Sequence, residues 1–209
     1  YGDGDGDARV FVGIAGSPGS GKSTLASAVR DRLNAAAGAE VCVVFPMDGF
    51  HYYRSQLADP DMFPDPDEAR ARRGAPWTFD ARAFVDRVRA ARANDGTAGD
   101  DVPTKVPAFD HEVHDPEEDA IDIYPSHKVI LVEGNYLLLD HGPWPALADY
   151  FDFSLFLEVA DTVLEQRLIE RWLGMGQDQA GAIAKTRDKD MLNARLIKTR
   201  SITADLHWH

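Results

Sequence analysis

One short segment of the chain has the residue types and the spacing of a phosphate-binding loop. Its residues are Gly16, Ser17, Pro18, Gly19, Ser20, Gly21, Lys22 and Ser23, with Thr24 following. They match the pattern G-x-x-x-x-G-K-[ST] in full, whose glycines let backbone N–H groups surround phosphate oxygens. In such a loop Lys22 reaches the β- and γ-phosphates of ATP, and the Ser23 hydroxyl binds Mg²⁺. We therefore predict that ATP and Mg²⁺ are cofactors and that residues 16–24 bind the nucleotide.

The sequence on either side of this loop supports the interpretation. An apolar strand is predicted at Val10–Ala15 and a helix from about Gly21 to Ala36, so the positive end of the helix would face the phosphates. A glycine-rich turn that carries a lysine by coincidence is the alternative, and this setting disfavours it. Two marks of GTPases are missing, because a later strand ends in Glu133-Gly134 instead of D-x-x-G, and no N-K-x-D motif occurs. The loop alone does not make a kinase, but these absences disfavour a GTPase.

Asp48 is a candidate catalytic residue because of its place in the chain. It follows directly after a second predicted buried strand, Val41–Phe45. In a doubly wound sheet the carboxyl ends of the strands face the ligand crevice. There, Asp48 could accept the proton of an attacking hydroxyl group or position Mg²⁺. An aspartate–glycine turn with no chemical role is the alternative reading of Asp48 and Gly49.

Four further segments follow the phosphate-binding loop in a distinctive order, and they are 48–51, 72–80, 107–111 and 129–134. Together with the loop they resemble the phosphoribulokinase/uridine kinase family, most of all its uridine-kinase-like branch. The Asp-Gly-Phe run is also similar to that of bacterial-type pantothenate kinase. The resemblance covers the chain from Val10 to Leu206 and implies an ATP-dependent kinase that phosphorylates a hydroxyl group of a small metabolite.

The resemblance also implies roles for individual residues. Asp48 matches the family's catalytic base, and Glu133 matches an acidic residue that works with Mg²⁺ or its waters. Arg167 and Arg171 match arginines of a closing lid that neutralise the transferred phosphate. Their i, i+4 spacing places both on one helix face, which agrees with that role. The alternative for this pair is a solvated helix face with glutamate partners nearby.

The acceptor is expected to bind along two excursions from the sheet, at about 46–80 and 103–125. Uridine kinases read the base with a Tyr-Asp-Phe run followed by a histidine, whereas this chain has Phe109-Asp110-His111, with His114 at the spacing of that histidine. We therefore expect a polyol-like or sugar-like acceptor over uridine, while nucleosides, pantothenate-like alcohols and sugar acids all stay open. The predicted acceptor-binding residues are His51, Arg54, Arg73, Trp77, Phe79, Asp80, Phe109, Asp110 and His111.

The order of elements predicts an α/β class fold, a three-layer α/β/α P-loop domain with a five-stranded parallel sheet and a helical lid at about 167–188. Residues 1–8 look linker-like or trimmed, and 9–209 should form a single kinase domain. Trp144 and Trp172 are expected to pack in apolar surroundings, and Thr162 with Glu165 to form a capping box. Further strands are predicted at Thr104–Phe109, Ala120–Tyr124, Val129–Val132, Phe153–Val159 and Ala204–Trp208. Helices are predicted at Ala81–Ala93 and from Asp161 or Thr162 through Trp172. Two further helical stretches, separated near Asp188, are predicted after them.

Composition limits the partners. The 209 residues include 22 Lys and Arg against 35 Asp and Glu, a formal net charge of −13, which disfavours nucleic acids and anionic membranes. No apolar stretch has a bilayer-spanning length, no signal peptide is recognised, and Cys42 lies alone in an apolar run. We expect a cytoplasmic protein with a small-molecule partner, and a homo-oligomer stays open. The alternative function is a P-loop ATPase or an ATP-sensing regulatory protein that phosphorylates no acceptor.

Overall fold

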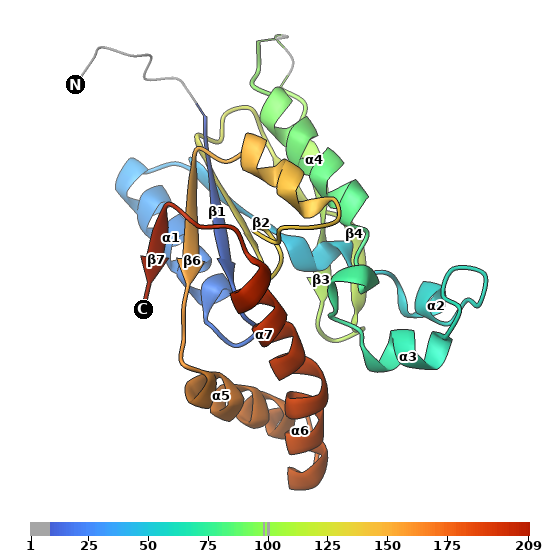
Figure 1. The fold of residues 1–209 in the computed structure, drawn as a ribbon. Helices are drawn as coiled ribbons and strands as arrows, with labels where there is room; N and C mark the ends of the chain where they lie inside the picture. The colour runs from blue at the N-terminus through green and yellow to red at the C-terminus, as the bar shows by residue number, and fades with distance from the viewer. Residues whose placement is uncertain (1–8, 98, 100) are drawn as a thin grey trace.

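The structure is a computed structural model that describes residues 9–97, 99 and 101–209 (Figure 1). The interpretation of residues 1–8 as linker-like lies outside the described residues. At the centre is a five-stranded, all-parallel sheet with the strand order β2-β5-β1-β6-β7. This confirms the predicted α/β class and the five-stranded parallel sheet. The strands are β1 Val10–Gly16, β2 Cys42–Pro46, β5 Val129–Gly134, β6 Phe153–Leu157 and β7 Leu206–Trp208.

The neighbouring strands β2, β5 and β1 end at nearly the same level of the sheet. Ala15 of β1 is in register with Gly134 of β5, and Pro46 of β2 is in register with Glu133. A parallel sheet buried on both faces needs apolar residues at nearly every position, which explains the run Val-Ile-Leu-Val in β5. Because these three carboxyl ends meet at one edge, the residues that follow them are brought together.

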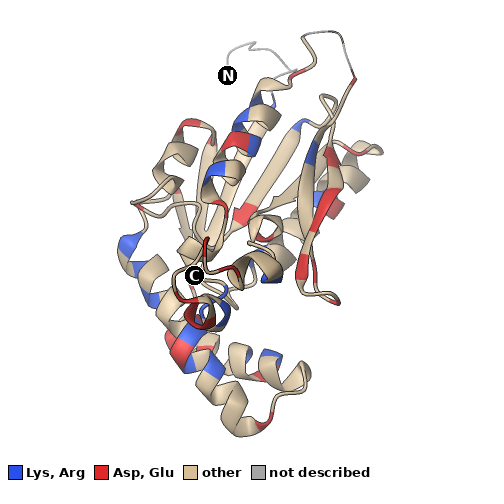
Figure 2. Ribbon diagram, turned by 90° about the vertical axis from the view of Figure 1, so that its right-hand side faces the viewer, with Lys and Arg blue, Asp and Glu red and all other residues tan. Residues whose placement is uncertain are grey.

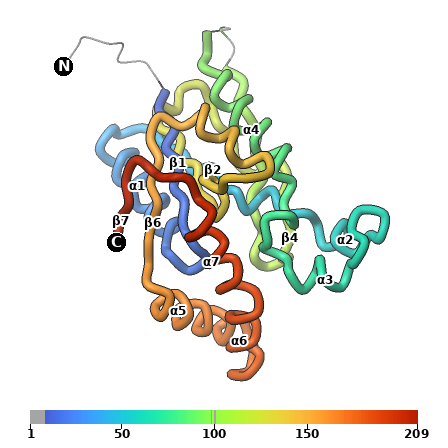
Figure 3. The backbone as a smooth tube through the Cα atoms, in the orientation of Figure 1, coloured from blue at the N-terminus to red at the C-terminus, as the bar shows by residue number. Residues whose placement is uncertain are grey.

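Helices cover both faces of the sheet and complete the three layers (Figures 1 and 3). On one face, α1 (Lys22–Ala37) buries Ala26 against Ile14 and Leu131. On the other face, a larger apolar cluster joins the sheet to α4 (Ala81–Ala93), to the 3-10 helix η3 (Trp144–Asp149) and to α7 (Met191–Arg200). Trp144 is buried in that cluster, as predicted.

A helical arm extends away from the carboxyl edge of the sheet (Figure 3). It consists of α5 (Asp161–Gly174), α6 (Gln179–Lys185), a π-helical turn (Thr186–Asp190) and α7. The break expected near Asp188 is therefore a π turn that keeps the chain helical. The expected capping box at the start of α5 is wrong, because Ala160 is the N-cap with no side-chain hydrogen bond, and Glu165 instead accepts from Arg187 Nε at 2.6 Å.

The first of the two excursions contains short helical elements. These are the 3-10 helix η1 (Met47–Phe50), α2 (Arg54–Leu57), α3 (Pro66–Ala71) and the 3-10 helix η2 (Pro76–Thr78). Asp80 then caps the start of α4 by accepting the N–H of Ala83 at 2.9 Å. Among the described residues, no helix combines the length and the apolar character that crossing a membrane would require.

Strands β3 (Thr104–Asp110) and β4 (Asp115–Ile123) form a separate antiparallel pair beside the main sheet (Figure 1). Strand β4 begins five residues before the predicted Ala120. Its first half is a run of acidic residues, visible as a red stripe in Figure 2, and such a run hides a strand from pattern-based prediction.

The β3–β4 pair lies in close contact with the chain just after β2. A Cβ atom placed on Gly49 of η1 would overlap the backbone carbonyl group of Pro107 and lie 3.0 Å from the amide nitrogen of Ala108. These carbonyl and amide atoms belong to the backbone of β3, which cannot move aside as the end of a flexible side chain can. Glycine at position 49 therefore sets the distance between Asp48 and the β3–β4 pair.

We predict that Gly49→Ala lowers the free energy of unfolding by about 1–3 kcal/mol, because the added methyl group has no room beside β3. Gly174→Ala is the matched control, since a Cβ atom there meets nothing within 4 Å. Urea denaturation of both variants checks the prediction. Equal stability of the two variants would show that η1 and β3 separate without cost.

Candidate active site

The loop between β1 and α1 has the backbone shape that its glycines allow. Gly19 and Gly21 lie in the left-handed region, with φ of 77° and 96°. This region is open to glycine but disfavours other residues. The hydroxyl oxygens of Ser17 and Ser20 are buried and have no hydrogen-bond partner among the described residues. Buried polar atoms normally have partners, so these two indicate a site shaped for a polar ligand.

Three charged side chains meet where β1, β2 and β5 end. Lys22 begins α1, Asp48 lies in η1, and Glu133 is the penultimate residue of β5 with 6% of its surface exposed. Burial and the charge of Asp48 raise the pKa of Glu133 to about 7, while Lys22 and the Ser23 hydroxyl act in the opposite direction. Burial lowers the pKa of Lys22, and the two carboxylates oppose that shift. The predicted catalytic residues of the nucleotide site are therefore neighbours.

Ser23 and Glu133 offer the oxygen atoms that Mg²⁺ prefers. Mg²⁺ is usually held by one or two carboxylates together with substrate phosphates and waters. Within the described ranges, no group of three or more His, Cys, Asp or Glu residues could hold a metal ion. A hydroxyl and a carboxylate beside a phosphate-binding loop match the pattern in which the nucleotide supplies the other ligands.

The two arginines of α5 have different neighbours. Arg167 Nη1 donates to the carbonyl oxygens of Gly19 and Ser20, at 3.2 and 3.4 Å. Arg171 lines the cavity beside Asp48 and lowers the pKa of Lys22 by repulsion. The nearby glutamates pair elsewhere, since Glu165 binds Arg187 and Glu170 accepts from Gln166. Arg167 thus faces the phosphate-binding loop and Arg171 the Asp48 cavity, and neither forms an ion pair within the described part of the chain.

A cavity of about 580 Å³ opens beside Asp48 between the acceptor excursions and the helical arm. It brings together six of the residues predicted for the base and the acceptor pocket, which are Asp48, His51, Arg54, Arg73, Phe109 and His111. Arg171, predicted for the lid, and His114, at the spacing of the base-reading histidine, also line it. The sequence analysis did not select the remaining lining residues for the site, and these are Trp172, Met175, Gln177, Lys185 and Lys189.

Two of the lining residues are held rigidly. The Nδ1 atom of His51 lies 2.8 Å from the carbonyl oxygen of Asp48, and the His51 ring stacks on Phe79 with ring centres 3.9 Å apart. Burial lowers the pKa of His51. Arg73 donates to Asp115 at 2.7 Å and to the carbonyl oxygen of Tyr52 at 3.0 Å, so it ties the start of β4 to the chain after η1.

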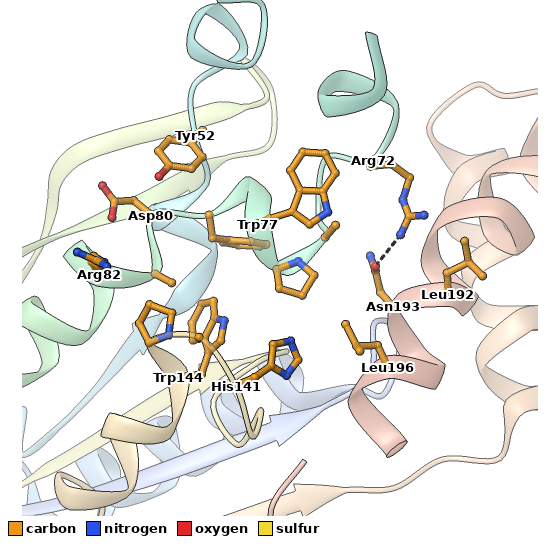
Figure 4. A pocket seen from close by; sticks show the side chains of 16 residues that line it. Tyr52, Arg72, Trp77, Asp80, Arg82, His141, Trp144, Leu192, Asn193 and Leu196 are labelled. Atoms are coloured by element: carbon orange, nitrogen blue, oxygen red, sulfur yellow. Dashed lines mark hydrogen bonds between the residues drawn. The ribbon is translucent and has the colours of Figure 1, made fainter. Parts of the chain in front are cut away.

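Trp77, Phe79 and Asp80 do not line the Asp48 cavity. They surround a second cavity of about 660 Å³, whose other walls are the β5–β6 connection, with Trp144, and α7 (Figure 4). Phe79 is packed between His51 and buried aromatic residues, and Asp80 caps α4. Phe79 and Asp80 therefore have roles in packing and capping that account for their positions, while Trp77 is exposed at the rim of the second cavity.

Asp110 also lies outside the Asp48 cavity. Its carboxylate accepts the N–H groups of Glu112 and Val113 at 2.6 and 3.0 Å, and these hydrogen bonds lower its pKa. The side chain thus closes the turn between β3 and β4 and does not face the acceptor.

Trp172 is not part of an apolar core, contrary to the packing expected for it. Its indole Nε1 donates to Asp190 at 2.7 Å, and its ring lies 4.6 Å from the Lys185 ammonium and 4.9 Å from that of Lys189. The i, i+4 spacing of the two lysines was the one sequence signal that could have identified them as a pair. Their relation to Trp172 depends on how α5 packs against α6.

Comparisons with known proteins agree with this geometry. The model of the phosphoribulokinase/uridine kinase family matches residues 11–187. A Schizosaccharomyces pombe protein named "putative uridine kinase" is 38% identical over 200 residues, which cover 95% of this chain and 82% of the relative.

Two solved structures share the fold over nearly their whole length. A "putative fructose transport system kinase" from Silicibacter sp. has a TM-score of 0.85 and 34% identity, covering 100% of this chain and 93% of its own. YFH7 from Saccharomyces cerevisiae has a TM-score of 0.80 at 23% identity, covering 96% of this chain and 92% of its own. The latter supports the fold alone.

The raised pKa of Glu133 predicts a pH-dependent stability in the absence of nucleotide. Its usual pKa is 4.5, so an unfolded chain releases this proton earlier than the folded chain, whose Glu133 has a pKa of about 7. The stabilisation from keeping the proton is complete below pH 4.5 and is lost as the pH rises through 7. Relative to Glu133→Gln, the protein should lose roughly 1–3 kcal/mol of unfolding free energy over this window.

Urea denaturation at several pH values between 4.5 and 8 checks this prediction, with exposed Glu170→Gln as the control. The difference in unfolding free energy between the protein and Glu170→Gln should not change with pH. Parallel pH profiles for the protein and Glu133→Gln would contradict the assignment.

Proposed function

This chain belongs to the phosphoribulokinase/uridine kinase family, and on that premise we propose that it transfers the γ-phosphoryl group of ATP to a hydroxyl group of a small acceptor. One observation carries the proposal above all. A cavity large enough for a small metabolite opens beside Asp48, which neighbours Lys22 of the phosphate-binding loop. Nucleotide and acceptor would then meet at the carboxyl edge of the sheet, where α/β proteins bind their ligands.

The nucleotide would be held by the loop, by the first turn of α1 and by two arginines of α5. Backbone N–H groups of residues 16–24 would surround the phosphates, and Lys22 would contact the β- and γ-phosphates. Arg167 and Arg171 would neutralise charge that spreads over the transferred group. Ser23 and Glu133 would hold Mg²⁺, which supplies further charge neutralisation when it is bound.

Asp48 is the best candidate for the general base. It is the only carboxylate among the described residues that line the cavity. It would take the proton of the acceptor hydroxyl as the oxygen bonds to the γ-phosphorus, while the bond from that phosphorus to the bridging oxygen breaks and ADP leaves. His51 is less suited, because its Nδ1 binds the Asp48 carbonyl and its position is fixed by Phe79.

A polyol-like or sugar-like acceptor fits the cavity better than uridine. Stacking a pyrimidine needs a free aromatic face. The ring of Trp172 is contacted by two lysines, and that of Phe109 by His51 at 5.0 Å, His111 at 5.3 Å and Arg73 at 5.4 Å. One of the similar proteins is named for uridine and another for a fructose transport system, so these names do not select an acceptor.

We predict that Asp48→Asn lowers kcat by about 10²- to 10⁴-fold and leaves ATP affinity nearly unchanged, because the amide still fits but accepts no proton. Asp110→Asn is the matched control, since this aspartate lies in the β3–β4 turn outside the cavity. Steady-state kinetics and titration with an ATP analogue measure both quantities. If Asp48→Asn abolished nucleotide binding without a separate defect in kcat, Asp48 would be a metal or structural residue.

We also predict that a sugar, polyol or sugar acid has a higher kcat/KM than uridine or cytidine, because a site built to bind hydroxyl groups strongly rejects molecules that lack them in the right places. ADP release is measured across a panel of these compounds and pantothenate. A uridine value well above every non-nucleoside would overturn the acceptor assignment. ADP release that needs no acceptor would instead favour an ATPase.

A further inference from the structure

The Asp48 cavity has a charge opposite to that of the whole chain. The formal net charge of the protein is −13. Within the described residues that line this cavity, however, Asp48 is the only negative side chain, and positive ones come from both walls. They are Arg54 and Arg73 from the acceptor side, and Arg171, Lys185 and Lys189 from the helical arm.

Most of these positive charges form no salt bridge. Arg73 is the exception, with Asp115 at 2.7 Å. Across the described residues, Arg54, Arg171, Lys185 and Lys189 form no salt bridge, and the two lysines instead lie against the ring of Trp172. The carboxylate of Asp190 attracts Arg171, Lys185 and Lys189, but its hydrogen bond is with the indole N–H of Trp172 at 2.7 Å. One carboxylate therefore faces three positive charges.

The arrangement is costly without a ligand. The pKa of Lys189 is lowered first by burial and then by repulsion from Arg171, Lys185 and Arg73, against the attraction of Asp190. Placing several like charges around one water-filled space is unfavourable unless an anion fills it. The geometry of the cavity therefore indicates a negatively charged ligand.

The phosphates of ATP account for only part of the positive charge in this region. Lys22 and Arg167 lie at the phosphate-binding loop, because Arg167 of α5 donates to two of the loop's carbonyl groups. The charge of Arg171 acts on both Lys22 and Lys189, so Arg171 is close to the loop and to the cavity. Lys185 and Lys189 line the same cavity as Arg54 and Arg73. Among the described positive side chains that line the cavity, only Arg171 affects Lys22, so we assign the other four charges to the acceptor and not to the nucleotide.

We propose that the acceptor itself is an anion, whose carboxylate or phosphate group binds between Lys185, Lys189 and Arg54 while its hydroxyl group lies at Asp48. This inference rests on the proposed kinase function and makes it narrower. Carboxylates and phosphates both accept charge-assisted hydrogen bonds from lysine and arginine. The shared chemistry is a small hydroxylated molecule with an anionic group at one end.

Matched pairs of acceptors test the proposal. Glycerate is compared with glycerol, gluconate with glucose, and ribose 5-phosphate with ribose, and ADP release is measured for each. We expect the acid of at least one pair to exceed its neutral partner by about 10- to 100-fold in kcat/KM, the usual effect of a hydrogen bond to a charged group. The carboxylate and phosphate pairs distinguish the two sources of charge.

The outcomes separate this inference from the proposed function. If the best substrate is a neutral compound, the kinase function stands and the anionic acceptor is wrong. If ADP release is the same with and without every compound, the kinase function fails and this inference fails with it. Calorimetric titration of the acids into protein saturated with a non-hydrolysable ATP analogue measures acceptor binding independently of turnover, and no binding by any acid would also overturn the inference.

Lys189→Gln locates the anion site, and Arg187→Gln is its matched control. Arg187 lies two residues away with the same charge but pairs with Glu165 outside the cavity. We expect Lys189→Gln to raise KM for the acidic acceptor about 10- to 100-fold, to leave KM for ATP and for the neutral partner nearly unchanged, and to be rescued by Lys189→Arg. Arg187→Gln should change none of these. An equal rise in KM for ATP would assign these charges to the nucleotide and overturn the proposal.

Discussion

The ion cluster of Lys22, Asp48 and Glu133 is the constraint around which the rest of the site is arranged. Glu133 ends the strand that lies between β2 and β1, so its carboxylate is close to both the phosphate-binding loop and η1. A carboxylate this deeply buried is costly unless a positive partner is near, and Lys22 supplies that partner. The sheet therefore has to hold β2, β5 and β1 in one register for the cluster to form.

The parts of the site that depend on local sequence were predictable. The phosphate-binding loop follows from a motif and Asp48 from the end of an apolar strand, whereas Glu133 of β5 was expected from the family resemblance. The carboxyl ends of parallel strands meet regardless of what connects them, so strand order was not needed to bring these residues together. The alternation of strands and helices sufficed for the α/β class.

The acceptor pocket was less predictable because its walls come from segments that are distant in the chain. Trp77 and Phe79 lie only a few residues from Arg73, yet the 3-10 helix η2 turns them toward the second cavity. Conversely, Lys185 and Lys189 line the Asp48 cavity because α5 packs against α6, which brings the ring of Trp172 into contact with both ammonium groups. Contacts of this kind depend on packing between helices, for which a single sequence carries little signal.

Net charge is a poor guide to the charge of a site in such a protein. The acidic residues of β4 and of the outer surface lower the overall charge, but water and salt screen exposed charges beyond a Debye length of about 8 Å. Side chains that line a cavity are screened less, so Lys189 and its neighbours dominate the potential that a bound ligand meets. An anionic metabolite would thus be repelled only weakly by the acidic surface and held strongly inside the Asp48 cavity. A nucleic acid is too large to enter the cavity and would meet only the acidic surface. The same composition that disfavours polyanions as partners is therefore compatible with a small anion as substrate.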